Sequence, residues 1–232
     1  MTIPNDRDRP SLDALAVVLS FAAGATDAFA FLQLGGIFTA NMTGNVVLSG
    51  LITRPDYPAT LTGAIVAVVV FSGVVFAGFR VTRGAQVSTR RLGSVMGCGL
   101  AAQLAVAGIW AVDGGRRGMV LIMVVVALST TAMALQTVIG RRVEVRSRVA
   151  TTFVTGAITT LMKDAADGDL SEALVRIGTI VALAAGALCG AAVMTVDVAA
   201  GAVLPVIPSA VGLVLLLVAR RQNRRRPDQT RG

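Results

Sequence analysis

Six long apolar runs follow one another along the chain, separated by short polar segments. They span residues 12–34, 59–79, 92–112, 118–139, 173–196 and 199–219. Each is close to the roughly 20 residues that an α-helix needs to cross about 30 Å of hydrocarbon. Because backbone groups in lipid must find hydrogen-bond partners within the segment, these runs predict transmembrane helices. Pro205 and Pro208 lie inside the sixth run and predict a kinked or broken helix there.

Two polar segments that contain glycine interrupt this pattern. The first, residues 39–51, separates the first two apolar runs and begins Thr-Ala-Asn-Met-Thr-Gly-Asn. The second, residues 151–159, follows the fourth run and repeats the Thr-Gly pair. Both segments are too polar and too short to span a membrane, yet the first is too long and apolar for a tight solvated turn.

We predict that both polar segments fold back into the bilayer and form half-helices, over residues 46–51 and 158–162. Thr43, Asn45 and Thr155 then lie near the N-termini of these half-helices, as capping residues do. The alternative is an interfacial loop that packs on the outer ends of the long helices.

The two Thr-Gly pairs also suggest an internal repeat. Aligning them at an offset of 112 residues places the second apolar run on the fifth. Each half, residues 11–112 and 118–219 of a single domain 1–232, then has one span, a Thr-Gly segment and two further spans. Three crossings are an odd number, so the halves have opposite orientation, as in many secondary transporters. The predicted fold is therefore an all-α membrane protein of six transmembrane helices, in two inverted three-helix repeats with short re-entrant or broken segments.

Composition and charge agree with a membrane protein and predict its orientation. Only 15% of the residues are charged, against about 25% in soluble domains. If the N-terminus is cytoplasmic, 18 of the 21 basic residues fall in the cytoplasmic loops and tails; the three others are Arg54, Arg116 and Arg117. The positive-inside rule therefore predicts that both termini are cytoplasmic.

A cleaved signal peptide is the competing interpretation of the first run, because Ala23-Gly24-Ala25 resembles a cleavage site. The run continues past that site, so we expect it to be retained as a span.

Several classes of chemistry are excluded or disfavoured. The chain has no histidine, which rules out histidine bases and histidine-bound metals. Aromatic residues make up 4% of the chain, too few for a nucleic-acid stacking platform. Cys98 and Cys189 lie in apolar runs and predict small buried residues. We therefore expect no enzymatic activity, no metal, no cofactor and no nucleic-acid partner.

Asp27 is the most unusual residue within a span, fifteen residues into the first run. A carboxylate at bilayer depth costs about 2.5–3.5 kcal/mol on insertion scales. It predicts a proton or cation site, a contact to a ligand, or a structural partner for backbone N–H groups or for an arginine.

Other residues in the spans predict helix–helix contacts. Gln103 and Gln136 are suited to hydrogen bonds between helices. Glycines spaced four residues apart, at 93–97 and at 186–190, predict close approach of neighbouring helices.

Taken together, these motifs resemble the YoaK family of bacterial inner-membrane proteins, which have about this length and are grouped under a domain of unknown function. The resemblance covers essentially the whole chain and is carried by Gly24-x-x-Asp27-Ala28, Phe38-x-x-x-Met42-Thr43-Gly44-Asn45, Gln136, Arg141-Arg142 and Thr151-Thr152-x-x-Thr155-Gly156. One departure is Ala134-Leu135 before Gln136, where the family usually has a glycine. The resemblance implies an address in the inner membrane and no established activity.

The function that these features predict is a small secondary transporter or permease-like protein in contact with the lipid bilayer. Its candidate site for a small polar or anionic solute, between the two Thr-Gly segments, comprises Asp27, Thr43, Gly44, Asn45, Gln136, Thr155 and Gly156. Asp27 would couple protons or contact the solute. Six spans make a thin bundle, which favours a homodimer. The alternative function is a non-transporting membrane module for binding or assembly.

Overall fold

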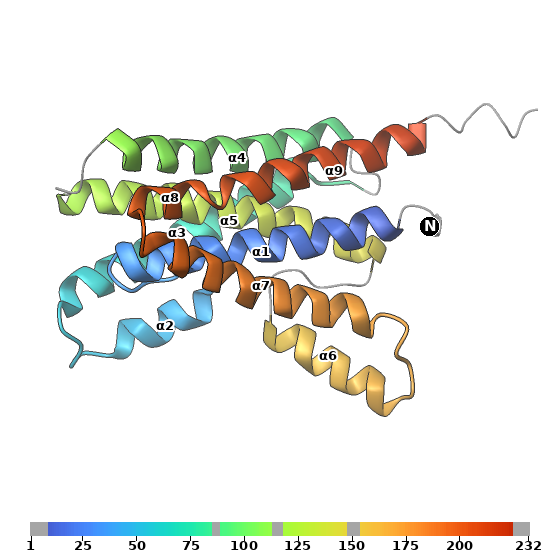
Figure 1. Ribbon diagram of the computed structural model, residues 1–232, viewed down its shortest axis with the longest axis horizontal. Coiled ribbons are helices and arrows are strands. Elements are labelled where there is room, and N and C mark those ends of the chain that lie inside the picture. The colour runs from blue at the N-terminus through green and yellow to red at the C-terminus, as the bar shows by residue number, and fades with distance from the viewer. Residues whose placement is uncertain (1–8, 85–88, 113–117, 148–153, 225–232) are drawn as a thin grey trace, which may run out of the picture.

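The apolar runs of the sequence form long helices in the computed structural model, which describes residues 9–84, 89–112, 118–147 and 154–224. Throughout these ranges the regular structure is helical, and no strand occurs in them. In chain order the helices are α1 (Arg9–Gln33), α2 (Met42–Gly50), α3 (Tyr57–Val81), α4 (Thr89–Val112), α5 (Met119–Ser147), α6 (Val154–Ala166), α7 (Ala173–Met194), α8 (Val198–Val203) and α9 (Val206–Arg224). Figure 1 shows the long helices running side by side, with α2 and α6 along one side of the bundle.

Six stretches of the described chain are long and apolar enough to cross a membrane, as the sequence predicted. They are Ser11–Gln33, Tyr57–Val81, Arg90–Val112, Met119–Arg142, Ala173–Met194 and Val198–Val218. The chain is therefore a multi-pass membrane protein whose helices contact the lipid bilayer.

The sixth span is broken, as its prolines predicted. Helix α8 ends at Val203 and α9 begins at Val206. Because proline has no N–H group, Pro205 and Pro208 cannot donate to the carbonyls four residues earlier, those of Gly201 and Leu204. The break follows from these two missing donors.

The two polar segments form the short helices α2 and α6. Helix α2 begins four residues before its predicted start, at Met42 rather than 46, and α6 is already helical at Val154, the first residue described after the gap, rather than from 158. The Thr-Gly pairs therefore lie inside the first described turn of each helix and do not precede it. Helix α2 packs against α3, and α6 packs against α7.

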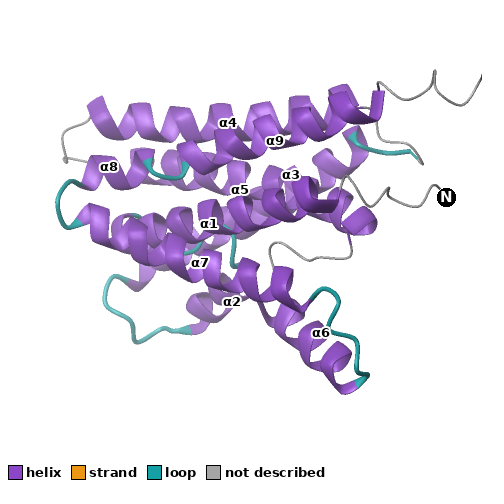
Figure 2. Ribbon diagram, turned by 45° about the vertical axis from the view of Figure 1, so that its right-hand side comes forward, coloured by secondary structure: helices purple, strands orange, loops and turns teal. Residues whose placement is uncertain are grey.

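Helix α1 lies in the centre of the bundle (Figure 2). Within its span 61% is buried by protein, more than in any other candidate span. Its main neighbours are α7, α9 and α5, with a smaller contact to α8. At one end of α1 the Phe29 ring meets the Trp110 ring edge-on, with centroids 4.7 Å apart. At the other end Leu15 and Leu19 pack with Leu216 in a second buried cluster.

The close contact between α1 and α7 depends on glycine. A Cβ atom at Gly186 would overlap the carbonyl group of Phe21, and one at Gly24 would overlap the carbonyl of Leu183. The glycines at 186–190 therefore mark a close helix crossing, as predicted. The glycines at 93–97 do not mark a close crossing within this chain, because Gly93 has only an ordinary contact to Leu217 and the space around Gly97 is open.

The prediction that both cysteines are buried was also wrong. Cys98 and Cys189 are exposed on α4 and α7. Both lie within spans, so this surface faces lipid. An apolar run does not distinguish a lipid-facing position from a core position, since both require apolar residues.

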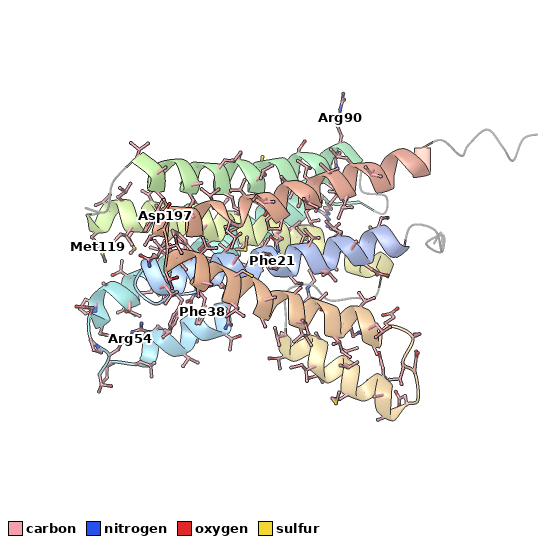
Figure 3. All side chains as sticks on the ribbon, in the orientation of Figure 1. Phe21, Phe38, Arg54, Arg90, Met119 and Asp197 are labelled. Carbon is pink, nitrogen blue, oxygen red and sulfur yellow. The ribbon has the colours of Figure 1, made fainter. Side chains whose placement is uncertain are left out.

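Charged side chains mark the two ends of the bundle. In Figure 3 Arg54 lies toward one end and Arg90 lies toward the other. Near the Arg90 end, Arg142 donates to Thr82 Oγ1 at 3.1 Å and to the carbonyl of Phe79 at 3.3 Å. These bonds satisfy acceptors at the C-terminus of α3. Which end faces the cytoplasm stays a prediction from the arginine distribution.

Candidate functional site

The segment after α1 turns back along the bundle. Gly35 and Gly36 have positive φ angles of 90° and 70°, which favour glycine. Their carbonyls accept hydrogen bonds from Thr60 Oγ1 at 3.2 Å and from Arg54 Nη1 at 3.4 Å. Ile37, which is fully buried, follows this turn. The first turn of α3 and Arg54, which precedes it, thus hold the turn in place.

Asp27 holds the returning chain at its own level on α1. Its Oδ1 atom accepts hydrogen bonds from the Thr39 N–H at 2.7 Å, the Ala40 N–H at 2.9 Å and Thr39 Oγ1 at 3.0 Å. Asp27 lies six residues before the end of α1, so residues 39–40 return about 9 Å along that helix. The first segment therefore turns back along α1, while its entry into the bilayer stays a prediction. Asp27 is a partner for backbone N–H groups, one of the roles considered for it.

Asn45 joins the returning chain to the first turn of α2. Its side chain is fully buried and accepts from the Phe38 N–H at 2.8 Å, while its Nδ2 donates to the Phe38 carbonyl at 2.7 Å. Both backbone groups of Phe38 are satisfied in this way, which lets the extended chain lie at this depth. Figure 3 shows Phe38 nearer the middle of the molecule than Arg54.

Thr43 and Gly44 have different surroundings on the same turn. Thr43 is exposed. A Cβ atom at Gly44 would lie 2.8 Å from Cδ2 of Phe38, so glycine makes room for that ring. The N-cap of α2 is Asn41, whose Oδ1 accepts from the Gly44 N–H at 3.1 Å. Thr43 and Asn45 lie in the first turn of α2, near its N-terminus as predicted, but the capping residue is Asn41, because the helix begins earlier than expected.

The second Thr-Gly pair lies on the first turn of α6. Thr155 and Gly156 are both exposed there, and Thr151 and Thr152 fall outside the described residues. In Figure 1 the first turns of α2 and α6 face each other along one side of the bundle, while their last turns point toward opposite ends.

A partly buried ion pair fixes the far end of α6. Arg176, only 6% exposed, is bonded to Asp164 of α6 and donates to Glu172 at 2.9 Å. Nearby on the surface, the hydrogen bond from Lys163 to Asp167 at 2.8 Å raises the pKa of the lysine. Arg176, expected only as a cytoplasmic basic residue, therefore clamps α6 to α7.

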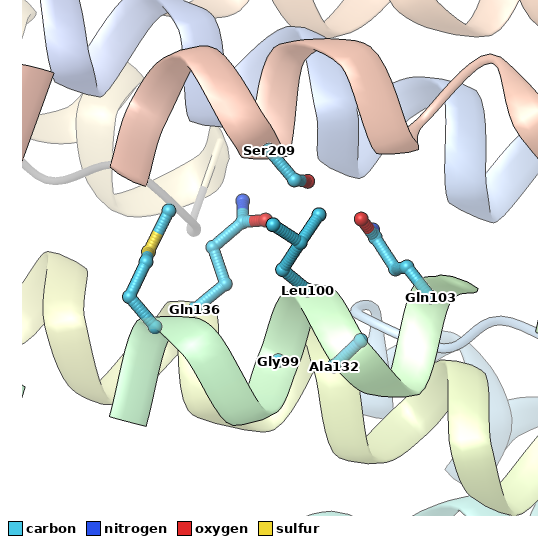
Figure 4. Close-up of a pocket in the computed structure, with 7 residues that line it drawn as sticks. Gly99, Leu100, Gln103, Ala132, Gln136 and Ser209 are labelled. Atoms are coloured by element: carbon cyan, nitrogen blue, oxygen red, sulfur yellow. The ribbon is translucent and has the colours of Figure 1, made fainter. Parts of the chain in front are cut away.

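Gln136 belongs to a different cluster from Asp27 and Asn45. Its Nε2 donates to the Leu19 carbonyl of α1 at 2.6 Å, which confirms its predicted role between helices. It lines a small cavity between α4, α5 and α9, together with Met96, Gly99, Leu100, Gln103, Ala132 and Ser209 (Figure 4). Ser209 was not singled out from the sequence, although its position directly after Pro208 in a broken span marks it.

The structure thus brings Asp27, Gly44 and Asn45 together around the returning segment, with the exposed Thr43 on the same turn, and places Gln136, Thr155 and Gly156 elsewhere. Thr26 and Asp27 are successive residues on α1, so their side chains point about 100° apart. Thr26 contacts Gln103 and Asp27 contacts Thr39. Helix α1 therefore separates the Gln136 cluster from the fold-back.

Comparison with known proteins agrees with this picture. The model of a family described as "Protein of unknown function (DUF1275)" matches residues 15–218. The chain belongs to this family. It is also similar to the UPF0700 transmembrane protein YoaK of Bacillus subtilis (strain 168), with 28% identity over 153 residues. That match covers 66% of this chain and 66% of the relative. No solved structure matches. The family resemblance seen in the sequence is confirmed.

Proposed function

We propose that this protein is a small secondary transporter of the permease type. Its solute, small and polar or anionic, would bind between the first turns of α2 and α6. The observation that carries this proposal is the fold-back that starts α2 at the level of Asp27. Discontinuous segments of this kind form the central sites of many transporters.

The start of α2 has chemistry that suits such a solute. The first N–H groups of a helix lack intrahelical partners and carry a partial positive charge. Asn41 accepts from one of them, the Gly44 N–H. The exposed Thr43 adds a hydroxyl at the same turn, and Thr155 adds one at the first turn of α6.

The inverted repeat remains part of this proposal. The C-terminal end of α2 lies at the start of α3, where Tyr57 Oη donates to the Ser49 carbonyl at 2.7 Å. The C-terminal end of α6 lies at the start of α7 through the Arg176–Asp164 pair. The C-terminal ends of the two short helices are therefore attached at opposite ends of the bundle (Figure 1). This arrangement supports two sequence halves that have opposite orientations in the membrane.

We further propose that the protein lies in the bacterial inner membrane with both termini cytoplasmic, has no enzymatic activity, and forms a homodimer. The arginine distribution supports this orientation.

A non-transporting membrane module for binding or assembly is the second candidate. The structural role of the Asp27 carboxylate favours this candidate. Three hydrogen bonds from residues 39–40 converge on one of its oxygens, so the carboxylate already has a structural role.

Accessibility of the two threonines tests the proposal. Cys98 and Cys189, which are exposed, are first replaced by alanine, and then Thr43→Cys and Thr155→Cys are made singly. A transporter that exposes its central site alternately should let a membrane-impermeant thiol reagent reach each position from both sides of the membrane.

Labelling of each cysteine from its own side alone would contradict a shared central site. Uptake into proteoliposomes, measured for a panel of small anions, amino acids and polyols under pH gradients of either sign, provides the second readout. Absence of flux for the whole panel would favour the non-transporting module.

A further inference from the structure

The cavity beside Gln136 contains two buried oxygen atoms that have no protein partner, Gln103 Oε1 and Ser209 Oγ. Gln103 is 4% exposed and Ser209 is 5% exposed. Both residues lie near the middle of their spans, 90–112 and 198–218. A polar atom left without a hydrogen bond in such surroundings costs about 1–3 kcal/mol.

The orientation of the Gln103 amide is fixed by its neighbour. Thr26 Oγ1 donates its only hydrogen to the Ala22 carbonyl at 2.8 Å. It can therefore only accept from Gln103, and Gln103 Nε2 lies 3.5 Å from it. The amide oxygen of Gln103 must then point away from Thr26 and into the cavity. Figure 4 shows the Gln103 and Ser209 side chains directed toward each other.

The size of the cavity suits one small molecule. Its volume is about 10 Å³ when measured as the space open to the centre of a water-sized sphere. A single water molecule needs about 10–15 Å³ by this measure, and two to four polar partners. The third polar side chain on the wall is Gln136, whose Nε2 is already bonded to the Leu19 carbonyl.

We propose that one water molecule binds in this cavity and bridges Gln103 Oε1 to Ser209 Oγ. The water donates to the amide oxygen and accepts from the serine hydroxyl. It joins the part of the sixth span that follows the proline break to α4, at mid-membrane depth. This site is independent of the proposed solute site, which lies on the other side of α1.

Thermal unfolding in detergent tests the bridge through Gln103→Leu, Ser209→Ala and the double variant. Each single variant should lower Tm by a few degrees, because it leaves the water without one partner. The double variant should lose clearly less than the sum, because both changes remove the same water. Ser72→Ala, at an exposed position on α3, is the matched control and should leave Tm unchanged.

An unchanged or raised Tm for Ser209→Ala would overturn the proposal, since a dry cavity gains from losing an unpaired hydroxyl. Strict additivity in the double variant would also overturn it. A structure determined at a resolution that shows ordered waters gives an independent readout. The expected result is one density peak about 2.7–3.2 Å from both oxygens, and an empty cavity would refute the bridge.

Discussion

At the scale of single residues, one carboxylate oxygen of Asp27 holds the segment that turns back along α1. Asp27 Oδ1 accepts two backbone N–H groups and one hydroxyl from residues 39–40. Without it these donors would lose their partner inside the protein, where Thr39 is fully buried, at a cost of about 1–3 kcal/mol each. This role requires an acceptor oxygen and does not by itself require a charge.

Two substitutions at Asp27 separate the acceptor from the charge. Asp27→Asn keeps an oxygen and should retain most of the thermal stability, whereas Asp27→Leu should lower Tm by several degrees because three donors lose their partner. The measurement is thermal unfolding in detergent, followed by circular dichroism. If Asp27→Asn folds normally and abolishes solute flux, the charge has a role in transport; if both variants unfold alike, the charge itself stabilises the fold-back.

At this scale the sequence predicted those roles that follow from the chemistry of a side chain alone. It did not predict roles that depend on where a helix begins or on which helices are neighbours. A carboxylate within a span needs donors, so the interest of Asp27 was visible in the sequence. Which asparagine caps α2 depends on where its first turn begins, and the sequence offers Asn41 and Asn45 alike. The pairing of Gln103 with Ser209 across helices leaves no periodic signal in either run.

At the scale of elements, the crossing of α1 and α7 is the tightest constraint on the bundle. Backbone lies where a side chain at Gly186 or Gly24 would project. Small residues allow this approach, and van der Waals packing then stabilises helix pairs in lipid.

Gly186→Ala should therefore destabilise the protein although it adds only one methyl group. The added Cβ overlaps the Phe21 carbonyl, so α1 and α7 must move apart. Gly97→Ala is the matched control, because its surroundings are open and alanine favours a helix by up to about 1 kcal/mol. Thermal unfolding of the two variants should differ clearly; equal stability would mean that the crossing is not tightly packed.

The elements themselves were largely predictable, and their environment was not. Apolar runs of about 20 residues predict spans, because a helix of that length is needed to cross the hydrocarbon of the bilayer. Pro205 and Pro208 predicted the break in the sixth span. Lipid and protein core are equally apolar, however, so hydropathy could not tell that Cys98 and Cys189 face outward. A fold-back of the segment 39–51 was predicted from its polarity, but the turn before it and the anchoring of that turn to Thr60 and Arg54 were not.

At the scale of the whole molecule, the helices of the two halves alternate in space. The main contacts of α1 are with α7, α9 and α5, while α3 and α4 pack against α5. The main neighbours of the first-half spans thus come from the second half. Neither half is expected to fold alone.

Splitting the chain at residue 114 tests this arrangement. Halves 1–114 and 115–232, expressed together, should copurify from detergent, because the α1–α7, α3–α5 and α4–α5 contacts join them. Each half expressed alone should aggregate or be degraded. A second half that carries Gly186→Leu is the matched control and should copurify poorly; stable, monodisperse halves would contradict the arrangement.

The central place of α1 also bears on how the protein is made. Translation delivers α1 first, but its largest contact is with α7 and its next with α9, the last two long helices to be synthesised. Until then the small-residue face around Gly24 has no permanent neighbour from α7. Helix α1 is therefore inserted into the membrane before its main partners exist, and the insertion machinery or other helices must cover this face in the meantime. Assembly of the bundle is completed only after the C-terminal helices have been synthesised.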